Sequence, residues 1–343
     1  MLIKKVSLPK ISIVTPSYNQ GEFLDECIDS ILSQNYPNLE YIIMDGGSTD
    51  GSVKIIKKYA KHLTYWQSCP DGGQYRAINE GFGKTSGEIM AWLNSDDKYH
   101  RDAFFKVAAI FDQLRGAEWI TGHPTHWGLD GEISLVEPTL HTYCRNDFLE
   151  GRYNRPFLQQ ESTFWKRSLW DRTGGCLRTD LDYAGDLELW VRFFRHTVLY
   201  SVGTFLGGYR NHGNQKAQLF MDRYVAEAEK VLEEELSLQG SDFILMSPEA
   251  PNPIDFDVKK YRHFLNLLRE GGLSIPSSQM AAGEDAVNVL LGRIAMLQAG
   301  FDNRNNLSAN SCNFFVELET MRASLSWRIT KPLRWLGDRF RGR

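Results

Sequence analysis

The 343-residue sequence contains few cysteines and no pairing pattern among them. Its five cysteines are scattered, odd in number, and never separated by two residues. This distribution argues against a disulfide framework and against a structural zinc site. We therefore expect the protein to work in a reducing compartment, the cytoplasm.

The sequence also lacks a long apolar run. No uninterrupted stretch approaches the ~20 residues that a membrane-spanning helix requires, and the first dozen residues show no apolar signal-peptide core. The net charge of -4 gives no general case for nucleic-acid binding. We expect a soluble or peripheral protein that binds no nucleic acid.

Strand and helix signals alternate over the first hundred residues. Short apolar strands are predicted at 11–15, 41–44, 63–66 and 89–93, and amphipathic helices at 23–32, 53–59 and 74–83. The last of these strands is almost wholly apolar, as expected at the buried centre of a parallel sheet. The pattern predicts a doubly wound α/β sheet, whose ligands bind beyond the carboxyl ends of the strands.

The pattern changes near residue 245. The segment 246–255 contains three prolines, which predicts a linker. Helices are predicted on either side of it, at 222–239, 256–270 and 284–299. We therefore predict a catalytic domain, 1–245, and a helical C-terminal extension, 246–343.

Four polar residues, Asn94-Ser95-Asp96-Asp97, follow the most apolar strand. Two adjacent carboxylates repel each other, which raises at least one pKa unless a cation lies between them and a ligand. Magnesium and manganese accept one or two carboxylate oxygens and complete their shell with water and phosphate. The alternative is a turn that caps the helix predicted from Asp102 to Leu114.

Three segments at predicted strand ends resemble, in order and spacing, the family 2 glycosyltransferases of the GT-A fold. They are Val14-Thr15-Pro16-Ser17-Tyr18-Asn19, Ile43-Met44-Asp45-Gly46-Gly47-Ser48-Thr49-Asp50-Gly51 and Trp92-Leu93-Asn94-Ser95-Asp96-Asp97. The resemblance covers about the first 215 residues. It implies an α/β fold with a Rossmann-like mixed sheet, the fold of nucleotide-diphospho-sugar transferases.

The resemblance implies a donor site built from strand-end residues. Those expected to contact the donor are Thr15, Pro16, Tyr18, Asp45, Asp71, Gln74, Asn94, Ser95 and Asp96. Asp45 matches the acid that recognises the base, although many members carry a second acid where this chain has Gly46. Asp71 matches a contact to the ribose and diphosphate. For Asp45 and Asp71 the alternative is a turn residue satisfied by local hydrogen bonds.

The resemblance also implies a divalent ion, manganese or magnesium, held by Asp96 and Asp97, with Asp97 as the direct ligand. Such an ion would neutralise the departing nucleoside diphosphate. His212, in the segment Tyr209–Gln215, matches a histidine near the diphosphate and is a candidate third contact to the metal or phosphate. The alternative for His212 is an ordinary surface histidine.

The segment that begins Gly185-Asp186-Leu187-Glu188 resembles the family's Glu-Asp motif. The resemblance implies that Asp186 deprotonates the acceptor hydroxyl, with Glu188 in reserve. Simple capping of a helix by Asp186 is the alternative. No second carboxylate is indicated as a covalent nucleophile, which favours inversion. Glu161 and Trp190 are expected on the acceptor side, although aromatic residues there could equally belong to the core.

The final segment, 324–343, interleaves aromatic residues with arginines. This composition suits a helix on an anionic membrane surface, and similar tails occur in bacterial glycosyltransferases that use lipid-linked acceptors. Docking on a partner or on the chain's own domain stays equally open. Lys331-Pro332-Leu333-Arg334-Trp335 lacks the glutamine of processive synthases, so we expect one sugar per encounter.

The sequence thus predicts a metal-dependent, inverting glycosyltransferase. It would move one sugar from a nucleotide-diphosphate donor to a hydroxyl of a glycan or lipid-linked acceptor, in polysaccharide, O-antigen or capsule biosynthesis at the inner face of the cytoplasmic membrane. One alternative is a catalytically inactive GT-A scaffold in a polysaccharide assembly complex. Another is a sugar-nucleotide nucleotidyltransferase, which would need a Gly-rich, Arg-containing loop after the first strand.

Overall fold

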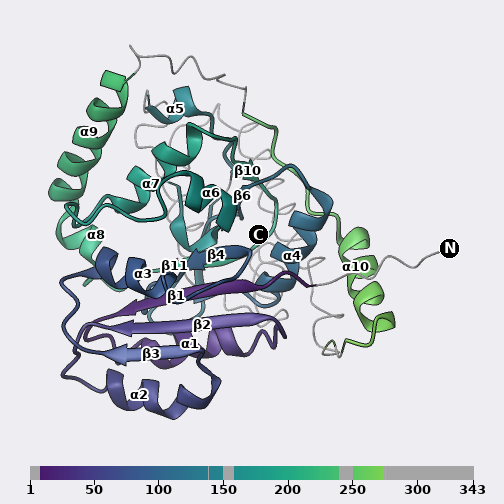
Figure 1. The fold of residues 1–343 in the computed structure, drawn as a ribbon, viewed down its shortest axis with the longest axis horizontal. Coiled ribbons are helices and arrows are strands. Elements are labelled where there is room, and N and C mark those ends of the chain that lie inside the picture. The colour runs from purple at the N-terminus through teal and green to yellow at the C-terminus, as the bar shows by residue number, and fades with distance from the viewer. Residues whose placement is uncertain (1–7, 138, 150–157, 239–249, 274, 276–343) are drawn as a thin grey trace, which may run out of the picture.

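The computed structural model describes residues 8–137, 139–149, 158–238, 250–273 and 275 (Figure 1). The helix predicted at 284–299 and the basic tail at 324–343 lie outside the described residues. Across the described ranges, no helix combines the length and the apolar character needed to cross a membrane.

A seven-stranded mixed sheet forms the centre of the molecule, in the order β10-β6-β9-β4-β1-β2-β3. Its strands are β1 (Ile11–Ser17), β2 (Leu39–Asp45), β3 (Tyr65–Ser68), β4 (Ile89–Trp92), β6 (Trp119–Thr121), β9 (Thr163–Lys166) and β10 (Tyr200–Ser201). The first four strands in the chain run parallel, whereas β9 runs antiparallel to both of its neighbours, β4 and β6. The predicted Rossmann-like mixed sheet is confirmed.

Four helices connect the first part of the sheet at the predicted places: α1 (Leu24–Leu32), α2 (Ser52–Tyr59), α3 (Gln74–Phe82) and α4 (Ala103–Gln113). In α1 the buried positions are Leu24, Cys27, Ile28 and Ile31, which recur at helical spacing and give one apolar stripe. This stripe packs into the main hydrophobic core. The connections hold the parallel strands so that their carboxyl ends face one side.

A small second sheet joins residues that are far apart in the sequence. Its order is β5-β11-β7-β8, with β5 (Lys98–Tyr99), β7 (Thr125–Trp127), β8 (Ile133–Val136) and β11 (Gly207–Arg210). Strand β5 follows Asp97 directly, and the residue at the N-cap of α4 is Asp102. The Asp96-Asp97 pair therefore does not cap α4, and the capping alternative is wrong.

The remaining helices surround the later strands. They are α5 (Arg145–Leu149), α6 (Arg167–Arg172), α7 (Gly185–Phe194), α8 (Lys216–Leu219), α9 (Met221–Ser237) and α10 (Val258–Glu270), with 3₁₀ turns η1 (Ala60–His62) and η2 (Gln160–Ser162). Figure 1 shows α9 beyond α7 at one side of the molecule and α10 beside α4 at the other.

A cluster of tryptophans fills the core between the sheet and α7. Trp190 on α7 stacks on Trp92 of β4, with ring centroids 6.0 Å apart and planes 8° apart. Trp165 of β9 packs edge-on against Trp92 at 5.5 Å. Because Trp190 is 1% exposed, its expected place on the acceptor side is wrong, and it stabilises the fold instead.

The segment after 250 packs on the same core. Ile254 forms a bridge with Val202, next to β10. On α10, Leu265 and Leu268 are fully buried in the main hydrophobic cluster. The domain boundary at 245 stays a prediction, but residues 254–268 belong to the core that supports the seven-stranded sheet.

Candidate functional site

The carboxyl ends of β1, β2 and β4 meet at one edge of the sheet. The register pairs Ser17 with Asp45 and Val14 with Trp92. The loops that follow these strands therefore lie next to one another, which places the three segments singled out in the sequence at one site.

Asp45 holds the loop between β2 and α2. Its carboxylate accepts hydrogen bonds from the backbone N–H of Gly47 (3.2 Å) and Ser48 (2.9 Å) and from the Ser48 and Ser68 hydroxyls (both 2.6 Å). The side chain is 1% exposed. Both carboxylate oxygens are thus engaged by the protein, which fits the turn-residue alternative and gives the loop a fixed shape.

Tyr18 and Asp71 lie against Gly46. Tyr18 is 63% exposed at the end of β1, whereas Thr15 and Pro16 are buried within that strand. A Cβ at position 46 would lie 3.1 Å from Asp71 Oδ2 and 3.3 Å from the Tyr18 ring, closer than comfortable van der Waals contact. A side chain at position 46, such as the second acid of the family motif, would therefore require Asp71 and Tyr18 to shift by a few tenths of an ångström.

A chain of hydrogen bonds joins α3 to the Asp-Asp pair. The Gln74 side-chain amide donates to Asn94 Oδ1 (2.8 Å), and the Asn94 amide donates to Asp97 Oδ2 (3.2 Å). Ser95, which lies between Asn94 and Asp97 in the sequence, is 4% exposed. Gln74 and Asn94 thus serve first to hold the loop after β4.

Asp97 points into the protein. It is 1% exposed, and its Oδ1 accepts a hydrogen bond from the backbone N–H of Arg210 (2.8 Å). Burial, followed by the charge of Glu161, raises the pKa of Asp97 well above its usual range. Burial likewise raises the pKa of Glu161, to about 7. Two buried neighbouring carboxyls resist double ionisation.

Glu161, on η2, is 5% exposed. Its carboxyl lies beside Asp97 inside the protein, and its expected place on the acceptor side stays a prediction. The aromatic residues that follow it, Phe164 and Trp165, are fully buried in β9. The core alternative holds for that segment.

Asp96 and His212 come together on the more open side of the same loop. His212 Nε2 lies 3.1 Å from Asp96 Oδ2, and the two side chains are 3% and 15% exposed, respectively. The His212 ring packs on Phe23, with centroids 4.5 Å apart. His212 is therefore the imidazole neighbour of Asp96, whereas the Asp97 side chain faces the interior of the protein.

The donor atoms of Asp96 and His212 suit manganese better than magnesium, whose ligands are oxygen atoms. Two ligands at right angles around an ion with bonds of ~2.1 Å lie ~3.0 Å apart, close to the separation seen. Among the described residues no group of three His, Cys, Asp or Glu side chains could hold a metal by itself. Carboxylate and imidazole are both ligands that manganese accepts.

Arg210, which the sequence reasoning missed, organises this loop. It is 1% exposed, and its Nε donates to the carbonyl oxygen of Asp96 (2.7 Å) while Nη2 donates to Glu26 Oε2 (2.7 Å). Its guanidinium also lies over the Phe23 ring, 5.0 Å from the centroid. The sequence carries no signal for this role, because the burial of Arg210 and its contact to a backbone carbonyl follow only from the fold.

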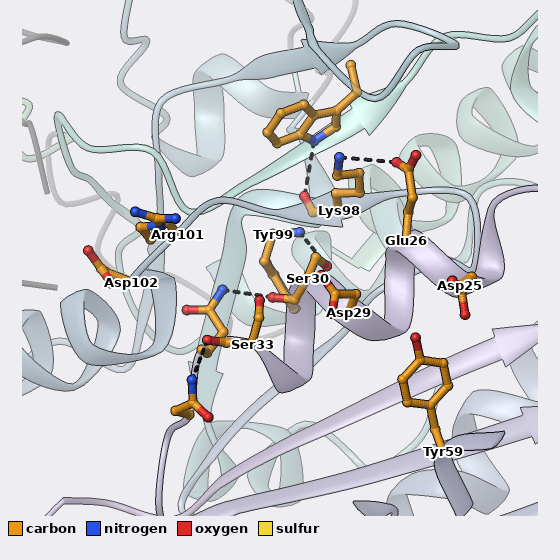
Figure 2. A pocket seen from close by; sticks show the side chains of 13 residues that line it. Asp25, Glu26, Asp29, Ser30, Ser33, Tyr59, Lys98, Tyr99, Arg101 and Asp102 are labelled. Carbon is orange, nitrogen blue, oxygen red and sulfur yellow. Dashed lines mark hydrogen bonds and ion pairs between the residues drawn. The ribbon is translucent and has the colours of Figure 1, made fainter. Parts of the chain in front are cut away.

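A cavity of 480 Å³ lies between α1 and β5 (Figure 2). Its wall includes Asp25, Asp29 and Glu26 from α1, and Lys98, whose ammonium points to Glu26 at 3.1 Å. None of the predicted donor, metal or base residues lines it. Glu26 nevertheless connects the cavity with the site, because the same carboxylate receives Arg210.

Asp186 occupies the first turn of α7 without capping it. The N-cap residue is Ala184, and Asp186 Oδ1 accepts a hydrogen bond from the adjacent backbone N–H of Leu187 (2.8 Å). The capping alternative is therefore wrong. Burial raises the pKa of the partly exposed Asp186 to about 6. Glu188, the reserve, is 6% exposed and paired with Arg192 through contacts of 2.8 Å.

Asp186 lies close to the strand-end site. The charges of Asp186 and Asp96 both contribute to raising the pKa of Glu161, after the effect of burial. The loop after β4, η2 and the start of α7 thus converge on one region. Two further neighbours of Asp186, Tyr75 and Glu227, were also missed by the sequence reasoning, because they act on backbone groups far away in the chain.

Comparison with known proteins agrees with this geometry. Residues 12–175 match the model of glycosyl transferase family 2. An uncharacterised glycosyltransferase of Mycobacterium tuberculosis is 31% identical over 194 residues, which are 54% of this chain and 69% of that protein. Bacillus subtilis TuaG, named for teichuronic acid biosynthesis, is 35% identical over 120 residues, 34% of this chain and 47% of its own length.

The fold is also similar to a solved structure. TarS residues 1–349 of Staphylococcus aureus, solved with UDP-GlcNAc, align with a TM-score of 0.51 and 16% identity over 82% of this chain and 86% of that one. At this identity the likeness concerns the fold alone, and it confirms the predicted GT-A architecture. The strand-end motifs, the family match and the mycobacterial relative together show that the chain belongs to glycosyltransferase family 2.

Proposed function

We propose that this chain transfers one sugar from a nucleotide-diphosphate donor to an acceptor hydroxyl with inversion at the anomeric carbon. The observation that carries the proposal is Asp186, a partly exposed carboxyl with a pKa raised to about 6, beside a strand-end loop that presents Asp96 and His212. A base whose pKa lies near the working pH is suited to proton transfer.

In the proposed reaction the acceptor oxygen attacks the anomeric carbon as the bond between that carbon and the donor phosphate oxygen breaks. The acceptor's proton passes to Asp186, and the nucleoside diphosphate leaves with the bonding electrons. Glu188 is held by Arg192, so it does not compete as the base. One base and no covalent nucleophile give a single displacement, hence inversion.

For the metal we propose Asp96 and His212 as protein ligands, in place of the direct role expected for Asp97. Asp97 instead fixes the loop through the Arg210 backbone. When bound, manganese or magnesium would supply positive charge to the leaving diphosphate. Tyr18, exposed at the end of β1, is proposed to contact the nucleotide base, and Asp71, next to it, the ribose or diphosphate.

The substrates are proposed from the similar proteins. TarS was solved with UDP-GlcNAc, so uridine sugars come first among the candidate donors. TuaG is named for teichuronic acid biosynthesis, which supports a glycan or lipid-linked acceptor in surface-polysaccharide assembly. We propose a cytoplasmic protein that works at the membrane surface where such acceptors are presented.

A donor screen tests the proposal. The full chain is incubated with UDP-, GDP-, dTDP- and CMP-linked sugars and manganese or magnesium, and release of the nucleotide is measured, with EDTA as control. Metal-dependent release from one donor class is expected. Binding without release even when acceptor glycans are added would favour the inactive scaffold. Pyrophosphate release from a nucleoside triphosphate and a sugar 1-phosphate would favour the nucleotidyltransferase.

Membrane association is tested with liposomes. We propose that the tail at 324–343 binds anionic surfaces through its aromatic residues and arginines. Full-length protein should sediment with anionic vesicles and not with zwitterionic ones, whereas residues 1–323 should stay in the supernatant. Equal partitioning of the two proteins would contradict the membrane role and leave docking on a protein as the alternative.

A further inference from the structure

The backbone that leads into α7 is held by a single carboxylate from α9. Glu227 accepts hydrogen bonds from three consecutive N–H groups, those of Asp182 (3.0 Å), Tyr183 (2.8 Å) and Ala184 (2.9 Å). These groups precede the first turn of the helix, where backbone N–H groups have no intrahelical partner. Glu227 therefore fixes the backbone immediately before the helix, up to and including Ala184 at the N-cap.

The next N–H group is held from the other side by Tyr75 on α3. Gly185 N–H donates to the Tyr75 hydroxyl (2.8 Å), and Tyr75 is 7% exposed. The phenol ring lies so close to Gly185 that a Cβ there would be 2.6 Å from Tyr75 Cζ. The glycine that replaces the family's acid and the tyrosine that covers it are thus a matched pair.

Four consecutive N–H groups, from 182 to 185, are therefore fixed by two side chains immediately before Asp186. Tyr75 directly follows Gln74, whose amide bonds to Asn94 in the loop that carries Asp96. The charge of Asp186 contributes to raising the pKa of Tyr75, after the effect of burial, so the hydroxyl and the carboxyl are neighbours. The first turn of α3 thus contacts both the loop after β4 and the segment that carries the proposed base.

We propose that Tyr75 and Glu227 are positioning residues that set the place of Asp186 relative to the donor. The proposal rests on Asp186 being the base of the proposed function. Neither residue reacts; each fixes the backbone from which the Asp186 side chain extends. Small displacements of a reacting group cost large factors in rate, so removing either contact should slow turnover more than it weakens donor binding.

The kinetic test uses Tyr75→Phe and Glu227→Gln in the full chain, with the best donor from the screen. Phe keeps the ring against Gly185 and removes the hydroxyl, whereas Gln keeps the shape and removes the charge. We expect kcat to fall about tenfold for each variant, the scale of losing one or two hydrogen bonds, with the donor KM within about twofold. A raised KM at unchanged kcat would contradict positioning of the base.

Two matched variants control for lost stability. Tyr36 is also buried and donates its hydroxyl to a backbone carbonyl, that of Pro9 (2.8 Å). Glu40, at the opposite end of β2 from the site, also accepts a backbone N–H, that of Ser86 (2.8 Å). Tyr36→Phe and Glu40→Gln should lower the melting temperature comparably and leave kcat unchanged. A similar loss of kcat in the controls would overturn the proposal.

A double-mutant cycle separates positioning from general damage. If Tyr75 and Glu227 act through Asp186, adding Tyr75→Phe or Glu227→Gln to Asp186→Asn should not lower the residual turnover further. Multiplying effects would mean that the two residues act elsewhere, and the proposal would be wrong.

A readout independent of activity is hydrogen–deuterium exchange of the peptide spanning 182–187. Exchange should speed up at least severalfold in both variants and not in the two controls, and unchanged exchange would refute the proposed contacts. The two hypotheses fail separately. If the proposed function is wrong, the wild type will not turn over any donor. If only the positioning role is wrong, the wild type will turn over its donor and the Tyr75 and Glu227 variants will do so equally well.

Discussion

Asp186 combines two properties that a general base needs, partial access to solvent and a pKa raised to about 6 by burial. The carboxylate is the active form, so kcat should rise as pH increases from 5 to 7, with a midpoint near 6, and then level off. Single-turnover rates across this range measure the midpoint. A midpoint near the ordinary pKa of aspartate would contradict the raised pKa of the base. Full turnover by Asp186→Asn would show that Asp186 is not the base.

The two aspartates after β4 should respond differently to substitution. Asp96→Ala is expected to abolish the effect of manganese on UDP binding and to leave the melting temperature nearly unchanged, because its side chain has few internal partners. Asp97→Ala should cost about 2–3 kcal/mol in the free energy of unfolding, since it leaves the buried Arg210 N–H without its acceptor. Calorimetric titration and urea unfolding measure the two effects. Loss of manganese dependence only in the Asp97 variant would restore Asp97 as the direct ligand.

At the scale of elements, a buried acid near the end of α9 helps to attach this helix to α5 and α7. Glu235, 2% exposed, bonds Arg195 at the end of α7 (Nε to Oε2, 2.8 Å) and also pairs with Arg145 of α5. Removing it leaves two arginines without their partner, so Glu235→Ala should destabilise the protein by roughly 2–4 kcal/mol. Its neighbour Glu234 is exposed and pairs with Arg178 and Lys230 at the surface, so Glu234→Ala should cost less than about 1 kcal/mol. Equal costs in urea unfolding would contradict this account.

The sequence predicts a helix or strand well where the apolar pattern of that segment alone is sufficient. The apolar run of β4 and the stripe of α1 mark buried structure, and strand ends in a doubly wound sheet mark the site. Periodicity shows that Trp190 faces inward from α7, but it does not say whether the inside is a core or a binding surface. The stacking of Trp190 on Trp92 shows that this face of α7 packs in the core.

The supporting residues of the site could not be read from the sequence, for a physical reason. Arg210, Tyr75 and Glu227 bond to backbone groups of segments 40 to more than 100 residues away. Any residue type can supply a backbone N–H or carbonyl, so no partner residue in the sequence signals the contact. Only the folded arrangement of α3, α7, α9 and β11 brings such pairs together.

At the scale of the whole molecule, the donor side and the base side of the site come from different parts of one core. Strands β1, β2 and β4 with their loops form one part, and α7 with α9 forms the other. Tyr75 joins them through α3, and Glu161 lies where their charges meet. A site assembled from both parts is sensitive to anything that shifts one against the other, including the packing of distant helices.

The extent of the folded unit gives the last prediction. Helix α10 buries Tyr261, Phe264, Leu265 and Leu268, and Ile254 pairs with Val202. Loss of the whole segment would expose the face of α4 on which α10 packs. Residues 1–245 should therefore be less stable than residues 1–275, by several kcal/mol if each lost aliphatic side chain counts about 1–2 kcal/mol, as measured by urea unfolding.

A single substitution checks the same point without truncation. Leu265→Ala in the full chain should cost about 2–4 kcal/mol, the range for a fully buried leucine. Asn266→Ala, on the exposed face of the same helix, should cost less than about 1 kcal/mol. If the 1–245 fragment matched 1–275 in stability, α10 would be a separate appendage. The boundary predicted at 245 would then be the true edge of the catalytic domain; otherwise that edge lies beyond α10.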